Sequence, residues 1–146
     1  MIKRITLLFV LMALAVTTAS AQYSTDGLYT LECVGTVMYM SGGTPGSPMP
    51  MIASVTDDAK FYIVENTSNP GAYNIISMDE QYLASSTGAY GTLIENTEVN
   101  RNSSTAGALL NLIDEGANPY RIECNTVSGL KAWNGQRGGD TQVGMG

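Results

Sequence analysis

Tyr29-Thr-Leu-Glu-Cys33, Tyr73-Asn-Ile-Ile-Ser77 and Tyr120-Arg-Ile-Glu-Cys124 are three versions of one five-residue phrase. They follow one another at intervals of 44 residues (29 to 73) and 47 residues (73 to 120). Self-similarity at a nearly fixed period indicates one supersecondary unit in three copies, which must stack to bury their apolar faces. In the first copy apolar residues alternate with polar ones, as in a half-buried β-strand. The phrases therefore predict three equivalent strands.

Further apolar segments follow each phrase at similar distances. The second lies at 39–40, 82–83 and 129–130, and the third at 51–52, at 93–94 and at Val143. The fourth is found in two copies only, at 61–64 and 109–113. Stretches rich in Gly, Pro, Asn and Ser separate these segments, as turns between strands do. Four short strands per copy predict an all-β domain with repeats near 27–65, 71–115 and 118–146.

The beginning of the chain has the features of an export signal. Lys3-Arg4 precedes an apolar run at 5–16, and Ala-Ser-Ala at 19–21 offers the small residues that a signal peptidase requires. The run is shorter than the roughly 20 residues needed to span a bilayer. We therefore predict a cleaved signal peptide at 1–21 and a domain at 22–146, in a secreted, periplasmic or cell-surface protein without a membrane partner.

Composition argues against several classes of function. The chain has seven Lys and Arg against 13 Asp and Glu, a formal net charge of −6, and removal of Lys3 and Arg4 brings it to −8. Because an acidic surface repels phosphate backbones, nucleic acid is not an expected partner. The sequence contains no histidine, which excludes His-activated nucleophiles and His-ligated zinc. Adjacent carboxylates at 57–58, 79–80 and 114–115 fall in turns or at strand ends, where we interpret them as solvated. We predict no enzymatic activity, no cofactor and no metal site.

The two cysteines occupy the same position in the first and third phrases. If the three opening strands surround a common axis, one core layer holds Leu31, Ile75 and Ile122, and the next holds Cys33, Ser77 and Cys124. Two thiols in one layer of an exported protein could form a disulfide. Two buried thiols are the alternative, because the sequence does not give the Cα separation that the bond requires.

The third copy carries a family resemblance. The phrase at 120–124, Ser-Gly-Leu-Lys-Ala-Trp-Asn-Gly at 128–135 and Gly-Asp-Thr-Gln-Val at 139–143 resemble the ricin-type β-trefoil lectin-like domains of secreted bacterial proteins. The resemblance spans about residues 27–146. It implies a β-trefoil, in which a six-stranded barrel is capped by three hairpins. It also implies a non-catalytic carbohydrate-binding or accessory module, which can be joined to a downstream catalytic domain.

Trp133 is the centre of the candidate carbohydrate site. It is the only tryptophan of the chain and stands beside an Asn-Gly turn, so that its indole could stack on a sugar ring of a glycan or polysaccharide. Directional hydrogen bonds would come from Asn134, Gln136, Asp140 and Gln142. The alternative is that Trp133 packs over the open end of the barrel. For the whole domain, the alternatives are a protein-interaction module, such as a trefoil-type protease inhibitor, and a structural spacer.

The third copy lacks a counterpart of the fourth strand. By the repeat period this strand would fall at about residues 154–159, after Gly146. A barrel without it has unpaired edges on the strands at 29–33 and 120–124. We therefore expect the domain to be C-terminally incomplete.

Overall fold

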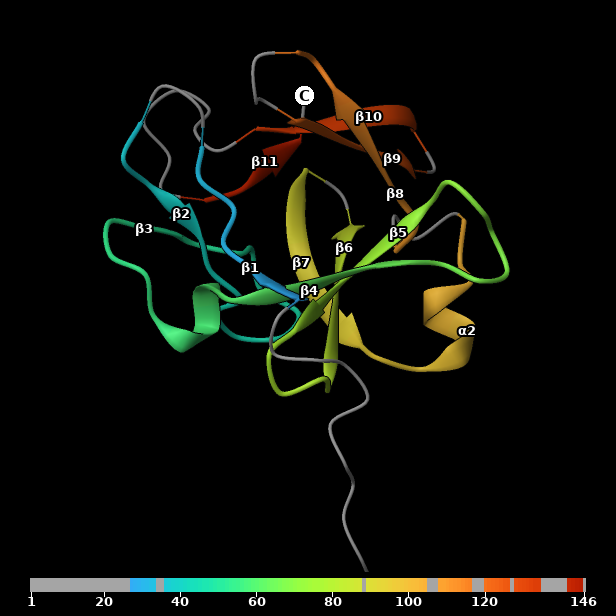
Figure 1. Ribbon diagram of the computed structural model, residues 1–146, viewed down its shortest axis with the longest axis horizontal. Helices are drawn as coiled ribbons and strands as arrows, with labels where there is room; N and C mark the ends of the chain where they lie inside the picture. Colours follow the sequence, from blue (N-terminus) through green and yellow to red (C-terminus); the bar gives the residue numbers. More distant parts are fainter. Residues whose placement is uncertain are drawn as a thin grey trace, which may run out of the picture.

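The computed structural model describes residues 27–33, 36–87, 89–104, 108–116, 120–126, 128–134 and 142–145. The predicted signal peptide at 1–21 lies outside these residues. The described part consists mainly of short strands, with a 3₁₀ turn and a helical turn (Figure 1). In chain order the elements are β1 (Leu28–Tyr29), β2 (Tyr39–Met40), β3 (Met51–Ile52), η2 (Asp57–Ala59), β4 (Phe61–Glu65), β5 (Tyr73–Ser77), β6 (Tyr82–Thr87), β7 (Tyr90–Glu95), α2 (Glu98–Arg101), β8 (Leu110–Asp114), β9 (Tyr120–Thr126), β10 (Gly129–Asn134) and β11 (Gly144–Met145).

Five of the described strands form the wall of a barrel. The pairs β1–β4, β4–β5, β5–β8 and β8–β9 are all antiparallel. These five are the opening and closing strands of the repeats. The other strands form the pairs β2–β3, β6–β7 and β10–β11, one in each repeat. This is the predicted β-trefoil, and its described part supplies five barrel strands.

The three repeats meet at a ring of backbone hydrogen bonds. The Met49 N–H donates to the Gly91 carbonyl at 2.8 Å, the Gly91 N–H to the Val143 carbonyl at 2.9 Å, and the Val143 N–H to the Met49 carbonyl at 2.8 Å. Each repeat thus gives one bond and receives one, which marks the threefold axis of the fold. The lack of a side chain at Gly91 allows this close approach, because a Cβ at this position would lie only 3.1 Å from Cγ1 of Val143.

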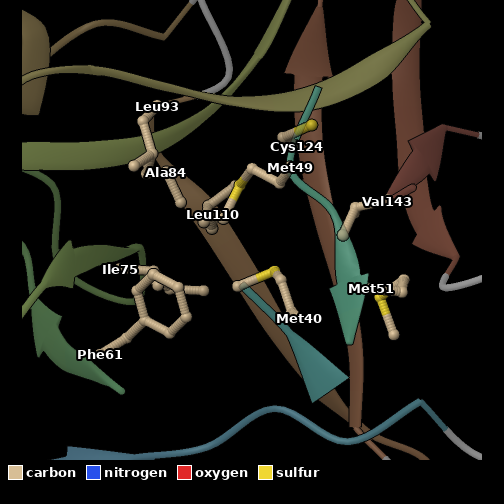
Figure 2. Packing of buried hydrophobic residues seen from close by; sticks show 10 residues of the cluster. All are labelled: Met40, Met49, Met51, Phe61, Ile75, Ala84, Leu93, Leu110, Cys124 and Val143. Carbon is tan, nitrogen blue, oxygen red and sulfur yellow. The ribbon is translucent and has the colours of Figure 1, made fainter. Parts of the chain in front are cut away.

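Alternation along the strands places side chains in two apolar clusters. In β4, Phe61 and Ile63 belong to the main core, whereas Tyr62 and Val64 belong to a second, smaller cluster. This is the period of two that a β-strand imposes. Figure 2 shows the buried members of the main core, which come from all three repeats: Met40, Met49, Met51, Phe61, Ile75, Ala84, Leu93, Leu110, Cys124 and Val143.

The predicted core layer is confirmed. Ile75 is fully buried in the main core, and Leu31 and Ile122 pack against it as partly buried residues. The three equivalent positions of the repeated phrase therefore face one interior.

The strand pairing corrects the alignment of the third repeat. The residue three positions after each opening tyrosine has a cross-strand partner on the following strand. These pairs are Glu32 with Tyr39, Ile76 with Leu83 and Glu123 with Ala132. The position after each partner is therefore equivalent, and it holds Met40, Ala84 and Trp133. The sequence alignment had placed Leu83 and Leu130 at the level of Met40. The pairing moves this level by one residue in the second repeat and by three in the third, where the β9–β10 hairpin is longer and Leu130 is 57% exposed. Val143 likewise corresponds to Met49 and Gly91, not to the residues at 51–52 and 93–94.

Candidate functional site

A groove of about 290 Å³ opens where the series of barrel strands ends. One wall is the chain from Leu31 to Cys33, directly after β1, and the other is the beginning of β9. Trp133 and Val143 border it from the third repeat. The lining residues are Leu31, Glu32, Cys33, Met40, Met51, Tyr120, Arg121, Ile122, Trp133 and Val143.

The groove lies where the repeat symmetry calls for a strand. In the first repeat β4 lies between β1 and β5, and in the second β8 lies between β5 and β9. Between β9 and β1, no strand of the described residues takes this place. Side chains that two neighbouring strands cover elsewhere in the barrel are therefore open here.

Trp133 is held in one orientation at the side of this groove. Its indole Nε1–H donates to Oγ of the buried Ser86 at 2.6 Å, and its ring packs against the main core. The residue is half-buried, and its position is equivalent to the core positions Met40 and Ala84. Trp133 therefore both packs on the core and presents part of its surface to the groove, so that the two interpretations of its role do not exclude each other.

The cysteines are thiols, so that of the two alternatives left open by the sequence the disulfide is absent from the structure. Cys33 is half-buried and lines the groove, whereas Cys124 is fully buried in the core. Burial raises the pKa of the Cys124 thiol, and hydrogen bonds with Ser86 and Trp133 offset this only in part. The Sγ of Cys124 lies 3.9 Å from the carbonyl oxygen of Lys131 on β10. The thiol of Cys124 is thus part of the core packing, and its raised pKa keeps it protonated near neutral pH.

The other predicted site residues are only partly gathered here. Asn134 is the last residue of β10 and pairs with Gly144, and Gln142 forms a β-bridge to Pro50. Gln142 is not among the described residues that line the groove. Gln136 and Asp140 lie outside the described residues.

The structure instead brings Tyr120, Arg121 and Glu32 to the groove. The Arg121 guanidinium forms ion pairs with Glu115 and with Glu123, the latter at 2.7 Å. Because these pairs are partly exposed, we expect each to contribute little to stability. Tyr120 is 61% exposed. The signal for these residues was present in the sequence, since they belong to the repeated phrases whose edges were expected to be unpaired.

The adjacent carboxylates lie in turns, as expected. Asp57 is in η2 and pairs with Lys60 at 2.8 Å on the surface, and Asp79 accepts hydrogen bonds from Ser77 and from the Gln81 N–H within its own turn. Among the residues that the structure describes, no group of three or more Cys, Asp and Glu side chains is placed to hold a metal ion. No helix in the same residues has the length and apolarity needed to cross a membrane.

Comparison with known proteins supports the fold. A designed protein with threefold symmetry, ThreeFoil, matches the chain with a TM-score of 0.64 over 82% of this chain and 87% of its own, at 14% sequence identity. At this identity the likeness shows the β-trefoil fold alone. No protein-family model matches the sequence, and neither does any curated protein.

Proposed function

We propose that this chain is a secreted, non-catalytic binding module of the β-trefoil class, and that its ligand is a carbohydrate bound at the groove beside Trp133. The observation that carries the proposal is an aromatic surface beside an open groove. Trp133 and the exposed Tyr120 both line it, together with the charged side chains of Glu32 and Arg121. Sugar sites combine such aromatic surfaces with a few polar groups. The ricin-type resemblance supports the same class of ligand.

The hydrogen bond to Ser86 adds to the argument. It fixes the indole before a ligand arrives, and a fixed side chain loses little conformational entropy on binding. Stacking uses the face of the indole and leaves the N–H bond to Ser86 intact. A sugar ring would therefore meet a surface that is already oriented.

Glycan-array binding of the wild type and of Trp133→Ala tests this function. We expect Trp133→Ala to lose about 1 to 3 kcal/mol of glycan affinity, the usual size of an anchoring aromatic contact. Leu130→Ala is the matched control, because Leu130 lies on the same strand but is exposed outside the groove. Circular dichroism must show that both variants keep the β-signal. Equal glycan binding by the folded Trp133→Ala variant, or no binding by the wild type, would contradict the proposal.

A protein-interaction module is the second candidate function. Most of the described residues that line the groove are Leu, Ile, Val, Met or Cys, a composition that suits apolar side chains better than sugar hydroxyls. The groove also lies between β1 and β9, where the described residues place no strand. Retention of a protein partner, with no retention of glycans, would favour this function over the first.

A further inference from the structure

Sulfur-containing side chains are concentrated in the first repeat. Four of the eight methionines of the chain lie there, as Met-Tyr-Met at 38–40 and Met-Pro-Met at 49–51, and Cys33 precedes them. Residues two positions apart in an extended chain face the same side, so each of these segments can place two thioethers on one face. All four methionines belong to the main core or pack against it, and so does Cys33.

The β2–β3 pairing brings two of the methionines together. Met40 of β2 lies directly opposite Met51 of β3. Directly opposite residues in a sheet have Cβ atoms about 4.5 to 5.5 Å apart and point to the same face. Figure 2 shows both side chains in the main core. Because a methionine side chain is unbranched and has three rotatable bonds, the two sulfur atoms can turn toward a common point.

The chain after β1 places Cys33 on the same face. Glu32 is bridged to Tyr39 of β2, and the Cys33 N–H donates to the Met38 carbonyl at 2.9 Å. Cys33 therefore lies opposite Met38 and is the diagonal neighbour of Met40. A diagonal pair on one face of a sheet is within reach of long side chains. Strand pairing inside the first repeat thus gathers the three sulfur atoms, whatever lies beside β1.

The same three side chains face one cavity. Cys33, Met40 and Met51 all line the groove, whereas Met38 is not among its described lining residues. Met40 and Met51 are buried, and Cys33 is half-buried, so that its thiol forms the outer part of the group. The arrangement therefore offers one thiolate and two thioethers to a ligand that enters past Cys33.

We propose that Cys33, Met40 and Met51 bind monovalent copper, Cu(I), as a site with sulfur ligands only. Thiolate and thioether sulfur are soft ligands, which select Cu(I) over harder metal ions. The thiol proton is released on binding, so that the thiolate and Cu(I) together carry no net charge. A divalent ion would leave a net positive charge among apolar side chains, which is costly. The site is independent of the carbohydrate proposed for the groove.

Replacement of methionine by leucine tests the thioethers, because this exchange keeps volume and apolarity. Oxygen-free titration of the full chain with Cu(I), in competition with a coloured chelator, gives affinity and stoichiometry. We expect one Cu(I) per chain. The double variant Met40→Leu and Met51→Leu should bind at least about tenfold more weakly, since even an outer-shell partner of a metal ligand is worth that much.

Met49→Leu is the matched control for the double variant. Met49 is fully buried in the same core, but it is not among the described residues that line the groove. Its replacement should leave the Cu(I) affinity unchanged. Equal affinities of the double variant and Met49→Leu would overturn the proposal, as would the lack of Cu(I) binding by the wild type.

The two cysteines form a second matched pair. Cys33→Ser should lose more affinity than the methionine variants, because it removes the negative charge that balances Cu(I). Cys124→Ser should retain the wild-type affinity, because Cys124 is not among the described lining residues. A larger loss in Cys124→Ser than in Cys33→Ser would overturn the assignment. Circular dichroism checks that the variants fold, and where one does not, the wild-type measurements that follow decide the question.

Spectroscopy of the wild type identifies the ligands and the place of the metal. X-ray absorption of the copper-loaded protein should show sulfur neighbours only, and nitrogen or oxygen ligands would overturn the proposal. Binding should also quench the emission of Trp133, the single tryptophan, because it lines the same cavity. Cu(I) binding without quenching would place the metal elsewhere. Zn²⁺ should not displace Cu(I), since it favours Cys, His and carboxylate ligands, and displacement would contradict a site selective for soft ions.

Discussion

At the level of single residues, the hydrogen bond between Trp133 and Ser86 joins the third repeat to the second. The buried hydroxyl is the hydrogen-bond acceptor for the indole, and the two residues are 47 positions apart in the sequence. The single tryptophan was recognisable in the sequence, and its packing was one of two interpretations. Its partner was not predictable, because a serine in a strand gives no sign of which distant side chain it will meet.

Ser86→Ala should reduce the free energy of unfolding by about 1 to 3 kcal/mol, because the indole N–H is left without an acceptor in a half-buried site. Urea unfolding followed by tryptophan emission measures this change. Ser54→Ala is the control, since Ser54 is exposed and should change stability very little. Equal stabilities of the two variants would show that the Ser86 hydrogen bond has no net effect.

The two thiols should differ in reactivity. Cys33 lines the open groove, whereas Cys124 is fully buried with a raised pKa. In the folded protein Cys124 should react with a thiol reagent at least about tenfold more slowly than Cys33. A difference of this size requires only that the local opening that exposes Cys124 cost about 1.4 kcal/mol. Peptide mapping after a timed reaction identifies the labelled cysteine. Faster labelling of Cys124 would contradict the assigned burial.

Cys124 should also make stability depend on pH in the alkaline range. Its pKa is raised in the folded state because of burial, so that the folded protein keeps a proton that the unfolded chain loses. The stabilisation is complete below the ordinary thiol pKa, about 8.5, and is lost as the pH rises through the raised value. Urea unfolding from pH 7 to 10 should show this loss in the wild type and less of it in Cys124→Ser. Identical pH profiles would assign the alkaline loss to other groups.

At the level of elements, the hairpins are held together around Gly91. A side chain at this position would compete with Val143 for space, because the new Cβ would lie 3.1 Å from Cγ1 of Val143. The same Cβ would lie 3.7 Å from Sδ of Met49. The sequence did not show this requirement, because one glycine among 16 carries no mark of a close approach.

Gly91→Ala should therefore destabilise the fold by about 1 to 3 kcal/mol, the usual cost of overpacking a core. Thermal and urea unfolding measure the effect. Gly27→Ala is the matched control, because a Cβ at Gly27 meets nothing within 4 Å and its φ is not positive. A stability of Gly91→Ala equal to that of the control would mean that Val143 moves aside without cost.

Strands were predictable where the repeated phrase is explicit, and less so where hairpin lengths differ. The opening strands β5 and β9 begin at the predicted tyrosines, and β8 lies close to the segment predicted at 109–113. The third repeat was misaligned in the sequence because Leu130 lies about as far after Tyr120 as Leu83 lies after Tyr73. Only the pairing of Glu123 with Ala132 shows that the core position is Trp133.

At the level of the whole molecule, the described barrel strands differ in how many neighbours they have, and amide exchange should reflect this difference. β5 is paired along both edges, with β4 on one side and with β8 and β6 on the other. Among the strands that the structure describes, β1 has β4 as its one neighbour. Buried strands exchange only by opening of the structure, and open edges exchange faster. Hydrogen exchange with mass spectrometry should therefore show slower exchange at 73–77 than at 28–33. Equal protection of the two segments would mean that another part of the chain covers the β1 edge.

The ring formed by Met49, Gly91 and Val143 has a further consequence for dissection of the domain. Each backbone bond in it joins two different repeats, so that the removal of one repeat breaks two of the three bonds. A repeat expressed by itself would have no partner at this position, and a pair of repeats would keep one bond. Separate single-repeat chains could rebuild the ring only if three met at once, so their folding would depend on roughly the third power of concentration. In the intact chain the covalent links between the repeats remove that dependence.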